Sequence, residues 1–296
     1  VLMYLCAAGV GTIGIADSDV VEESNLQRQV LYDTNDVGKQ KSKVAAERLA
    51  GQNPHILINS YAERITSQNA ISIVSGYDLV VDGTDNFATR YLLNDTCLLL
   101  DKPLVYGSVL RFEGHVAVFN LKSRVGTPGS NYRDLYPIPP SQETVPNCEQ
   151  AGVLGVLPGL VGSLQALEVI KILTHIGIPL SDQLLIVDGE TLDFRKIRIP
   201  NRGTRDSVKS LIDYEIFCKS DSKSHTLASN NQPHPMKEIT VEEIKKLMDD
   251  GTDFQLIDVR EPHEYDICNL NGELIPLSQV PHNVDRFDRD RMVVVH

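Results

Sequence analysis

Short apolar runs and longer amphipathic stretches alternate along the first hundred residues. Residues 12–16, 56–60 and 79–81 are short, apolar and partly β-branched, which is typical of buried strands. Between them, residues 38–49 and 67–75 repeat apolar positions at helical spacing. Because strands that alternate with helices indicate βαβ units, the sequence predicts an α/β fold with a mostly parallel sheet.

The pattern continues beyond residue 100. Further strands are predicted at 104–109, 115–121, 184–187 and 194–199, the first two joined by a turn at 113–114. A strongly apolar helix is predicted at 159–177. Residues 122–147 are rich in Pro, Ser and Asn, and a segment of this length is uncommon inside a compact domain unless it is functional or disordered. We therefore expect the sheet to continue past this segment.

A change in composition divides the chain near residue 219. From there to residue 235, Ser, Asn, His and Pro leave almost nothing to bury, which is typical of a linker. Beyond it, an amphipathic helix at 241–248 with Thr240 as N-cap is followed by strands at 254–257 and 292–295. The predicted divisions are a first domain over 1–218, a linker over 219–235 and a second domain over 236–296.

Composition and charge exclude several classes of partner. The 296-residue chain has a net charge of −12, a pI of about 5.1 and no basic run, which argues against nucleic acid or an anionic membrane as the main partner. No apolar stretch reaches the roughly 18 residues of a membrane span without a charge or turn residue. The cysteines are odd in number and far apart, which favours reduced thiols and a cytoplasmic protein. They are Cys6, Cys97, Cys148, Cys218 and Cys268.

The first predicted strand leads into an acidic residue, Asp17. In open parallel sheets, ligands lie beyond the carboxyl ends of the strands, and an acid there binds ribose about 20 residues after a glycine-rich phosphate turn. Residues 1–8 have the pattern of the second half of a helix, which Gly9 would end. We therefore expect Asp17 to bind ribose, and a further strand and glycine loop to precede Val1.

The loop after Asp17 carries a family motif. A D-x-D pair followed by S-N-L-x-R-Q resembles the MoeB/ThiF adenylyltransferases, bacterial relatives of the ubiquitin-activating enzymes. The matching residues are Asp17, Asp19, Ser24, Asn25, Leu26, Arg28 and Gln29. The resemblance implies a Rossmann-like sheet that binds ATP, in which Asn25 orients the phosphates and Arg28 offsets their charge. The alternative is a polar loop after a Rossmann strand, with Arg28 merely solvated.

Lysines open the helix predicted at 38–49. Lys39 and Lys41 fall in its first turn, an end that cations usually avoid. An anion shared with the backbone N–H groups explains them better than helix stability does. In the family's pattern Lys41 contacts ATP phosphate, and the alternative is a solvated surface lysine.

The phrase D-G-T-D-N follows the strand predicted at 79–81. It resembles the family's second nucleotide element, in which Asp85 serves the magnesium-bound phosphates of ATP; a hard cation suits such a carboxylate. Capping of the helix that begins near Phe87, by Thr84 or Asp85, is a complete structural alternative. Asp82 is interpreted as structural support.

The long segment at 122–147 corresponds to the family's crossover, which lies over the active site and guides the tail of a small protein substrate. It ends at Cys148, which matches the cysteine that can be acylated or persulfurated. A reactive thiolate there would need groups brought in by the fold, because no Lys, Arg or His stands nearby in sequence. The alternative is a packing cysteine and direct attack by a persulfide on the acyl-adenylate.

Many family members hold zinc with two C-x-x-C pairs, and this chain departs from that pattern. The matching positions are 131–134, which contain no cysteine, and 215–218, where only Cys218 remains. A structural zinc site needs four ligands. The sequence therefore predicts no zinc.

The second predicted domain resembles the rhodanese sulfurtransferases through D-V-R-E-P at 258–262 with Glu264. In that family a strand like 292–295 leads into the loop that begins with the persulfide cysteine, so we expect an incomplete domain that stops before that residue. Cys268 does not match it and is interpreted as a packing residue.

The resemblance implies ATP-dependent adenylation of the C-terminal glycine of a ubiquitin-like sulfur carrier that ends in Gly-Gly, with magnesium, a persulfide sulfur donor and a homodimer. The carrier could serve molybdopterin, thiamine or tRNA thiolation. Two other classes stay open, an NAD-dependent dehydrogenase and a non-catalytic scaffold for a ubiquitin-like protein. The dehydrogenase gives no reason for Arg28, Lys41 and Asp85 to occur together.

Overall fold

The computed structural model describes residues 1–123, 125–139, 152–220, 241–260, 265, 269–276, 279–280, 283, 286–288 and 291–295. The chain forms two compact units, Val1–Leu227 and Ala228–His296, which divide inside the predicted linker. Each unit is described by itself.

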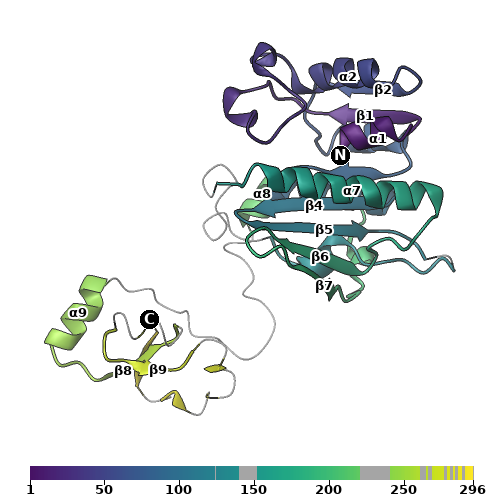
Figure 1. The fold of residues 1–296 in the computed structure, drawn as a ribbon. Coiled ribbons are helices and arrows are strands. Elements are labelled where there is room, and N and C mark those ends of the chain that lie inside the picture. Colours follow the sequence, from purple (N-terminus) through teal and green to yellow (C-terminus); the bar gives the residue numbers. More distant parts are fainter. Residues whose placement is uncertain are drawn as a thin grey trace. The chain divides into compact units, whose positions relative to one another are not determined.

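The first unit has an α/β fold (Figure 1). Its helices are α1 (Leu2–Ala7), α2 (Lys41–Gln52), α3 (Ala70–Ser75), α4 (Phe87–Leu100), α5 (Tyr132–Leu135), α7 (Val156–Thr174) and α8 (Tyr214–Ser220), with 3-10 turns at η1 (Glu23–Asn25), η2 (Thr34–Asp36) and η3 (Thr204–Ser207). Its strands are β1 (Thr12–Ala16), β2 (Leu57–Tyr61), β3 (Val80–Asp82), β4 (Leu104–Leu110), β5 (Glu113–Phe119), β6 (Gln183–Asp188) and β7 (Phe194–Arg198).

In the first unit, the strands near the predicted nucleotide site pair in parallel. β1 pairs with β2, and β3 pairs with β4, in parallel. From β4 the five-stranded sheet continues antiparallel in the order β3-β4-β5-β6-β7. The turn predicted at 113–114 is wrong, because β4 and β5 are joined at Arg111 and Phe112, with Arg111 at a φ of 53°.

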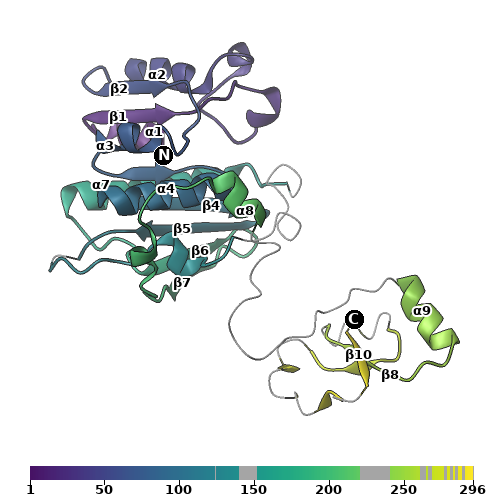
Figure 2. The ribbon, with the colours of Figure 1, turned by 180° about the vertical axis from the view of Figure 1, so that it is seen from behind.

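Alternation along β4, β5 and β6 sends side chains into two cores. Val105, Val116 and Val187 pack with Leu157 and Val161 of α7. Figure 1 shows α7 crossing this face of the sheet, and Figure 2 shows α4 and α8 on the other. There Leu104, Tyr106, Ala117, Phe119 and Leu184 pack with Tyr91 and Leu92. Because helices cover both faces of this sheet, a ligand site is expected at the ends of the strands.

Two helix starts and one capping residue differ from the sequence prediction. Helix α2 begins at Lys41 with Gln40 as N-cap, so Lys39 lies outside it and pairs with Asp36. Helix α4 is capped by Asn86, whose Oδ1 accepts a hydrogen bond from the N–H of Thr89 (2.9 Å), rather than by Thr84 or Asp85. Helix α7 begins and ends three residues before its predicted bounds, 159–177.

Helix α7 is, within the described residues, the one helix long and apolar enough to cross a membrane by length and composition. The same properties are found in core helices, and α7 packs against β4 and β5. Its charged residues Glu168 and Lys171 form an ion pair, and Glu168 also accepts a hydrogen bond from the N–H of Leu180 (2.9 Å).

The second unit contains α9 (Val241–Asp249) and the strands β8 (Phe254–Asp258), β9 (Glu273–Leu274) and β10 (Met292–Val295). Both strand pairings, in the order β10-β8-β9, are parallel. Ile257, Ile275 and Val294 are buried. The predicted cap Thr240 and Cys268 lie outside the described residues.

Gly14 of β1 offers a stability test. A Cβ there would lie 2.4 Å from Cζ of Tyr77, whose hydroxyl bonds Asn59 and Tyr61 at 3.0 Å each. We expect Gly14→Ala to lower the free energy of unfolding by about 1–3 kcal/mol. The matched control is Gly51→Ala in α2, where a Cβ meets open space; it should raise stability by up to about 1 kcal/mol. Urea unfolding followed by circular dichroism checks both, and equal stabilities would contradict this packing.

Candidate functional site

Asp17 and Asp19 lie directly beyond the carboxyl end of β1. The Asp17 carboxylate accepts a hydrogen bond from the N–H of Asp19 (2.8 Å), and its carbonyl accepts one from the Ser42 hydroxyl (3.1 Å). Ser42 belongs to the first turn of α2. The start of α2 is therefore fastened to the loop that follows β1.

Lys41 is the first residue of α2 and its side chain is buried, with 9% exposed. Its Nζ lies 3.3 Å from Oδ2 of Asp19, and its N–H donates to the Asp19 carbonyl (2.9 Å). A helix N-terminus has free N–H groups and a partial positive charge. An ammonium added there gives a place for an anion beside Asp17.

The structure brings Asp85 close enough to Asp17 to affect its ionisation. Burial raises the pKa of Asp17, and the Asp19 and Asp85 carboxylates raise it further, whereas the Asp19 N–H and Lys41 oppose this. The residues lie 68 positions apart in sequence (85 − 17) and follow different parallel strands. Asp85 therefore contributes to the electrostatic environment of Asp17, and its role in a shared nucleotide site stays a prediction.

Asn25 and Arg28 lie in the loop after β1. Asn25 is 4% exposed, its Nδ2 donates to the Ser24 hydroxyl (3.2 Å), and its buried Oδ1 has no hydrogen-bond partner in the described part of the chain. Arg28 donates to the Ser24 carbonyl (3.2 Å), and among the described residues it forms no hydrogen bond or ion pair with Asp17, Lys41 or Asp85. Its predicted role stays a prediction.

This loop meets the residue before α7. A Cβ on Gly155 would lie 2.3 Å from the carbonyl oxygen of Gln27, so only glycine fits without a shift. Gly155, which follows the predicted crossover in sequence, therefore lies against the loop that carries Asn25 and Arg28. Cys148 itself lies outside the described residues.

The loop after β3 is built on Asp82. Its carboxylate is buried and accepts hydrogen bonds from the N–H (2.8 Å) and hydroxyl (2.7 Å) of Thr84. Burial raises the pKa of Asp82, and Arg90 opposes this. Asp85 is exposed at the tip of the loop. Asp82 therefore supports a loop that presents Asp85, as the sequence interpretation held.

Two supports of this loop were missed from the sequence. Arg90 is 8% exposed and donates to the Thr84 carbonyl (3.0 Å). Gln165 of α7 is 4% exposed and donates to the carbonyls of Asp82 (2.7 Å) and Val105 (3.3 Å). The available signal was a polar residue at an otherwise apolar position of each helix, with Arg90 one turn after the cap of α4.

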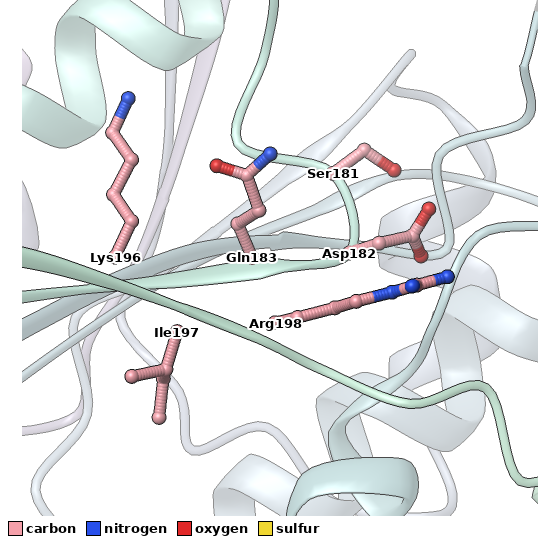
Figure 3. Close-up of a pocket in the computed structure, with 6 residues that line it drawn as sticks. All are labelled: Ser181, Asp182, Gln183, Lys196, Ile197 and Arg198. Carbon is pink, nitrogen blue, oxygen red and sulfur yellow. The ribbon is translucent and has the colours of Figure 1, made fainter.

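A hollow of about 420 Å³ lies elsewhere, at the β6–β7 edge of the sheet (Figure 3). It is lined by Ser181, Asp182, Gln183, Lys196, Ile197 and Arg198. None of the predicted site residues lines it. Lys196 and Ile197 point to opposite sides of β7 in Figure 3, as residues on an exposed strand do.

A model of the ThiF family matches residues 1–208. The chain belongs to the ThiF family. It is 42% identical over 298 residues to the probable adenylyltransferase/sulfurtransferase MoeZ of Mycobacterium tuberculosis, covering 100% of this chain and 74% of that relative. It is 50% identical over 224 residues to the sulfur carrier protein adenylyltransferase of Thermus thermophilus, covering 74% of this chain and 83% of that relative.

A solved structure of E. coli MccB with ATP has the same fold, with a TM-score of 0.58 and 20% identity over 67% of this chain and 59% of MccB. At that identity the likeness concerns the fold alone. It confirms the Rossmann-like α/β architecture of this ThiF family member.

Arg90→Met tests the support of the Asp85 loop. The change removes the donor to Thr84 and the cation near Asp82, so we expect the free energy of unfolding to fall by about 1–3 kcal/mol. The loss should shrink as the pH falls, because a carboxyl whose folded pKa lies above its unfolded pKa contributes stability when protonated. The control, Arg195→Met on the exposed strand β7, should change stability by less than about 0.5 kcal/mol. Urea unfolding at neutral and acidic pH checks this, and an Arg90→Met protein of unchanged stability would contradict it.

Proposed function

We propose that this protein uses ATP to adenylate the C-terminal glycine of a ubiquitin-like sulfur carrier and then supports sulfur transfer to it. The proposal rests on Asp17 and Lys41 beside the carboxyl end of β1, and on Asp85, which follows β3 and whose carboxylate raises the pKa of Asp17. Membership of the ThiF family and the names of its relatives, an adenylyltransferase/sulfurtransferase and a sulfur carrier protein adenylyltransferase, support the same reaction. The family assignment argues against a dehydrogenase.

The reaction requires positioning and neutralised charge rather than a strong base. The carrier's carboxylate attacks the α-phosphorus of ATP and forms an acyl-adenylate, and pyrophosphate leaves. Asp17 holds the ribose. Lys41 and Arg28 offset the charge that develops on the phosphates, and Asn25 orients those phosphates.

Lys41 has a defined route to this role. In the structure its ammonium faces the carboxylate of Asp19, which is 69% exposed at its side chain. Because the Asp19 carboxylate is largely exposed, water can solvate it when the pair separates. A bound phosphate can therefore replace Asp19 as the partner of the Lys41 ammonium.

Magnesium is the cation expected with ATP. No group of three or more His, Cys, Asp or Glu that could hold a metal occurs in the described ranges, so Asp85 would share the ion with phosphate oxygens and waters, as magnesium prefers. Such an ion offsets charge on the pyrophosphate that leaves. The exposed carboxylate of Asp85, which is close enough to raise the pKa of Asp17, fits that task.

The second unit is proposed to be a rhodanese-like domain that delivers persulfide sulfur. In its D-V-R motif at 258–260, the guanidinium of Arg260 binds the buried carboxylate of Asp258 through Nε (3.0 Å) and a terminal nitrogen (2.6 Å). This pair fixes the start of the loop after β8. A homodimer in the cytoplasm completes the proposal, and the pathway that the carrier serves is left open.

Pyrophosphate exchange tests the proposed reaction. The full-length protein should exchange labelled pyrophosphate into ATP only when magnesium and a carrier ending in Gly-Gly are present. Carrier binding without exchange would indicate the scaffold instead, and binding of NAD(P) without ATP would contradict the proposal.

Lys41→Ala and Arg28→Ala should each slow exchange about 30- to 1000-fold, equivalent to about 2–4 kcal/mol of transition-state stabilisation, without unfolding the protein. Lys39→Ala is the matched control, because Lys39 lies outside α2 and pairs with Asp36. Its rate should stay within about threefold of the parent. A Lys41→Ala protein with full activity would remove Lys41 from the site.

Cys148→Ser separates the two sulfur-transfer routes. If sulfur passes through a covalent carrier conjugate on this cysteine, adenylation should persist while thiocarboxylate formation is abolished, because adenylation uses only the nucleotide site. Mass spectrometry after turnover should show a reductant-sensitive conjugate in the parent alone. Unchanged thiocarboxylate yield in the variant would leave Cys148 as a structural residue.

A further inference from the structure

The positions that match the zinc ligands of related proteins carry other chemistry in this chain. Asn131 and Asp134 are 1% exposed each and form a capping box at the start of α5. Asp134 Oδ2 accepts hydrogen bonds from the N–H (2.9 Å) and Nδ2 (2.8 Å) of Asn131. Its Oδ1 accepts from the Thr204 hydroxyl (2.8 Å) and the Arg202 N–H (3.0 Å). Both carboxylate oxygens are therefore engaged by protein donors.

The other pair of positions does not complete a metal site. Glu215 is half-exposed and forms an ion pair with Arg64 (2.5 Å). Cys218 is 9% exposed and belongs to the core around Tyr91 and Tyr214. A structural zinc site takes four thiolate or imidazole ligands. A single buried thiol, an amide and two carboxylates in ion pairs or hydrogen bonds do not fit zinc.

A buried ion pair joins the same elements. The Arg133 guanidinium of α5 binds Asp95 of α4 through Nε–Oδ1 (2.9 Å) and a terminal nitrogen to Oδ2 (2.7 Å). Tyr214 at the start of α8 donates to the same Oδ2 (2.8 Å). Asp95 is 2% exposed. One carboxylate thus receives donors from both segments that zinc would otherwise hold.

Aromatic rings enclose the guanidinium of this pair. Its central carbon lies 4.9 Å from the ring centres of both Tyr91 of α4 and Phe217 of α8. Burial would lower the pKa of Arg133, and Asp95 more than offsets this, so the cation is held charged. A desolvated guanidinium between two rings gains cation–π energy in addition to its bidentate bonds.

We propose that α5 and α8 are fastened to α4 by the Asp95–Arg133 pair and its partners, in a joint that takes no metal. This α4–α5–α8 joint fixes α5, which lies within the crossover segment 122–147, to α4, the helix that begins beside Asp85. The joint contains one thiol where related proteins hold four, so its integrity should be independent of zinc supply and insensitive to thiol oxidants. The inference concerns the fold and does not rest on the proposed function.

Metal analysis of the full-length protein is the direct test. Protein purified without chelators should contain no stoichiometric zinc that depends on this joint, and its melting temperature should be unchanged by a strong zinc chelator. Zinc that is bound in the parent, lost in Cys218→Ser and required for the parent's melting temperature would overturn the proposal. If the Cys218→Ser protein still contains zinc, that zinc is bound outside the joint, and the joint itself is metal-free as proposed.

Substitutions test the pair itself. Arg133→Met leaves a buried carboxylate without its cation, and we expect the melting temperature to fall by roughly 6–15 °C. Arg133→Lys keeps the positive charge but loses the bidentate hydrogen bonds and the stacking on the rings, so its melting temperature should fall by an intermediate amount. It also gives a readout if Arg133→Met does not fold. The control Arg64→Met breaks the exposed pair with Glu215 and should change the melting temperature by less than about 2 °C. Equal melting temperatures for Arg133→Lys and the parent would contradict the proposed role.

Discussion

The carboxyl end of β3 depends on a buried carboxylate, Asp82, and on the groups that make its burial tolerable. An isolated charge costs several kcal/mol to bury, and here Arg90 opposes the resulting rise in the pKa of Asp82. Thr84 satisfies one carboxylate oxygen, while Gln165 binds the Asp82 carbonyl from the opposite face of the sheet. Polar contacts from two helices therefore fix the short loop on which Asp85 stands.

Helix α4 connects that loop to the crossover. Arg90 in its first turn donates to Thr84, and farther along the helix Asp95 binds Arg133 of α5 and Tyr214 of α8. Both contacts place charge in a core that is otherwise aromatic and aliphatic. Buried charges tolerate few alternative arrangements, because each must keep its partner. The same helix therefore orients the nucleotide loop and the segment expected to guide the carrier's tail.

Much of the fold followed from local patterns in the sequence. The strands lie within one or two residues of their predicted ranges, because short apolar runs are bounded by turn residues. The start of α4 near Phe87 was predicted correctly, although Asn86 rather than Thr84 or Asp85 caps it, whereas α2 and α7 begin three residues from their predicted starts. The β4–β5 turn was misplaced because the prediction followed Gly114, whereas Arg111 adopts the left-handed conformation.

Those parts of the candidate site that depend only on the order of strands and helices could be predicted from the sequence. Asp17 and Asp85 each follow the carboxyl end of a strand, β1 and β3, and that placement could be expected from the βαβ order. Arg90 and Gln165 could not be assigned in this way, because their roles depend on contacts with backbone carbonyls that no sequence spacing reveals. The absence of cysteines at 131 and 134 was visible, but the Asp95–Arg133 pair that joins the same elements was not.

The central claim is that Asp17 and Asp85 belong to one nucleotide site. A double-mutant cycle on the affinity of the full-length protein for magnesium ATP, using Asp17→Asn, Asp85→Asn and the double variant, tests it most directly. Residues that share one ligand and one electrostatic environment should show a coupling energy of at least about 0.5 kcal/mol. Additive losses within about 0.3 kcal/mol, or no loss from either change, would contradict the shared site.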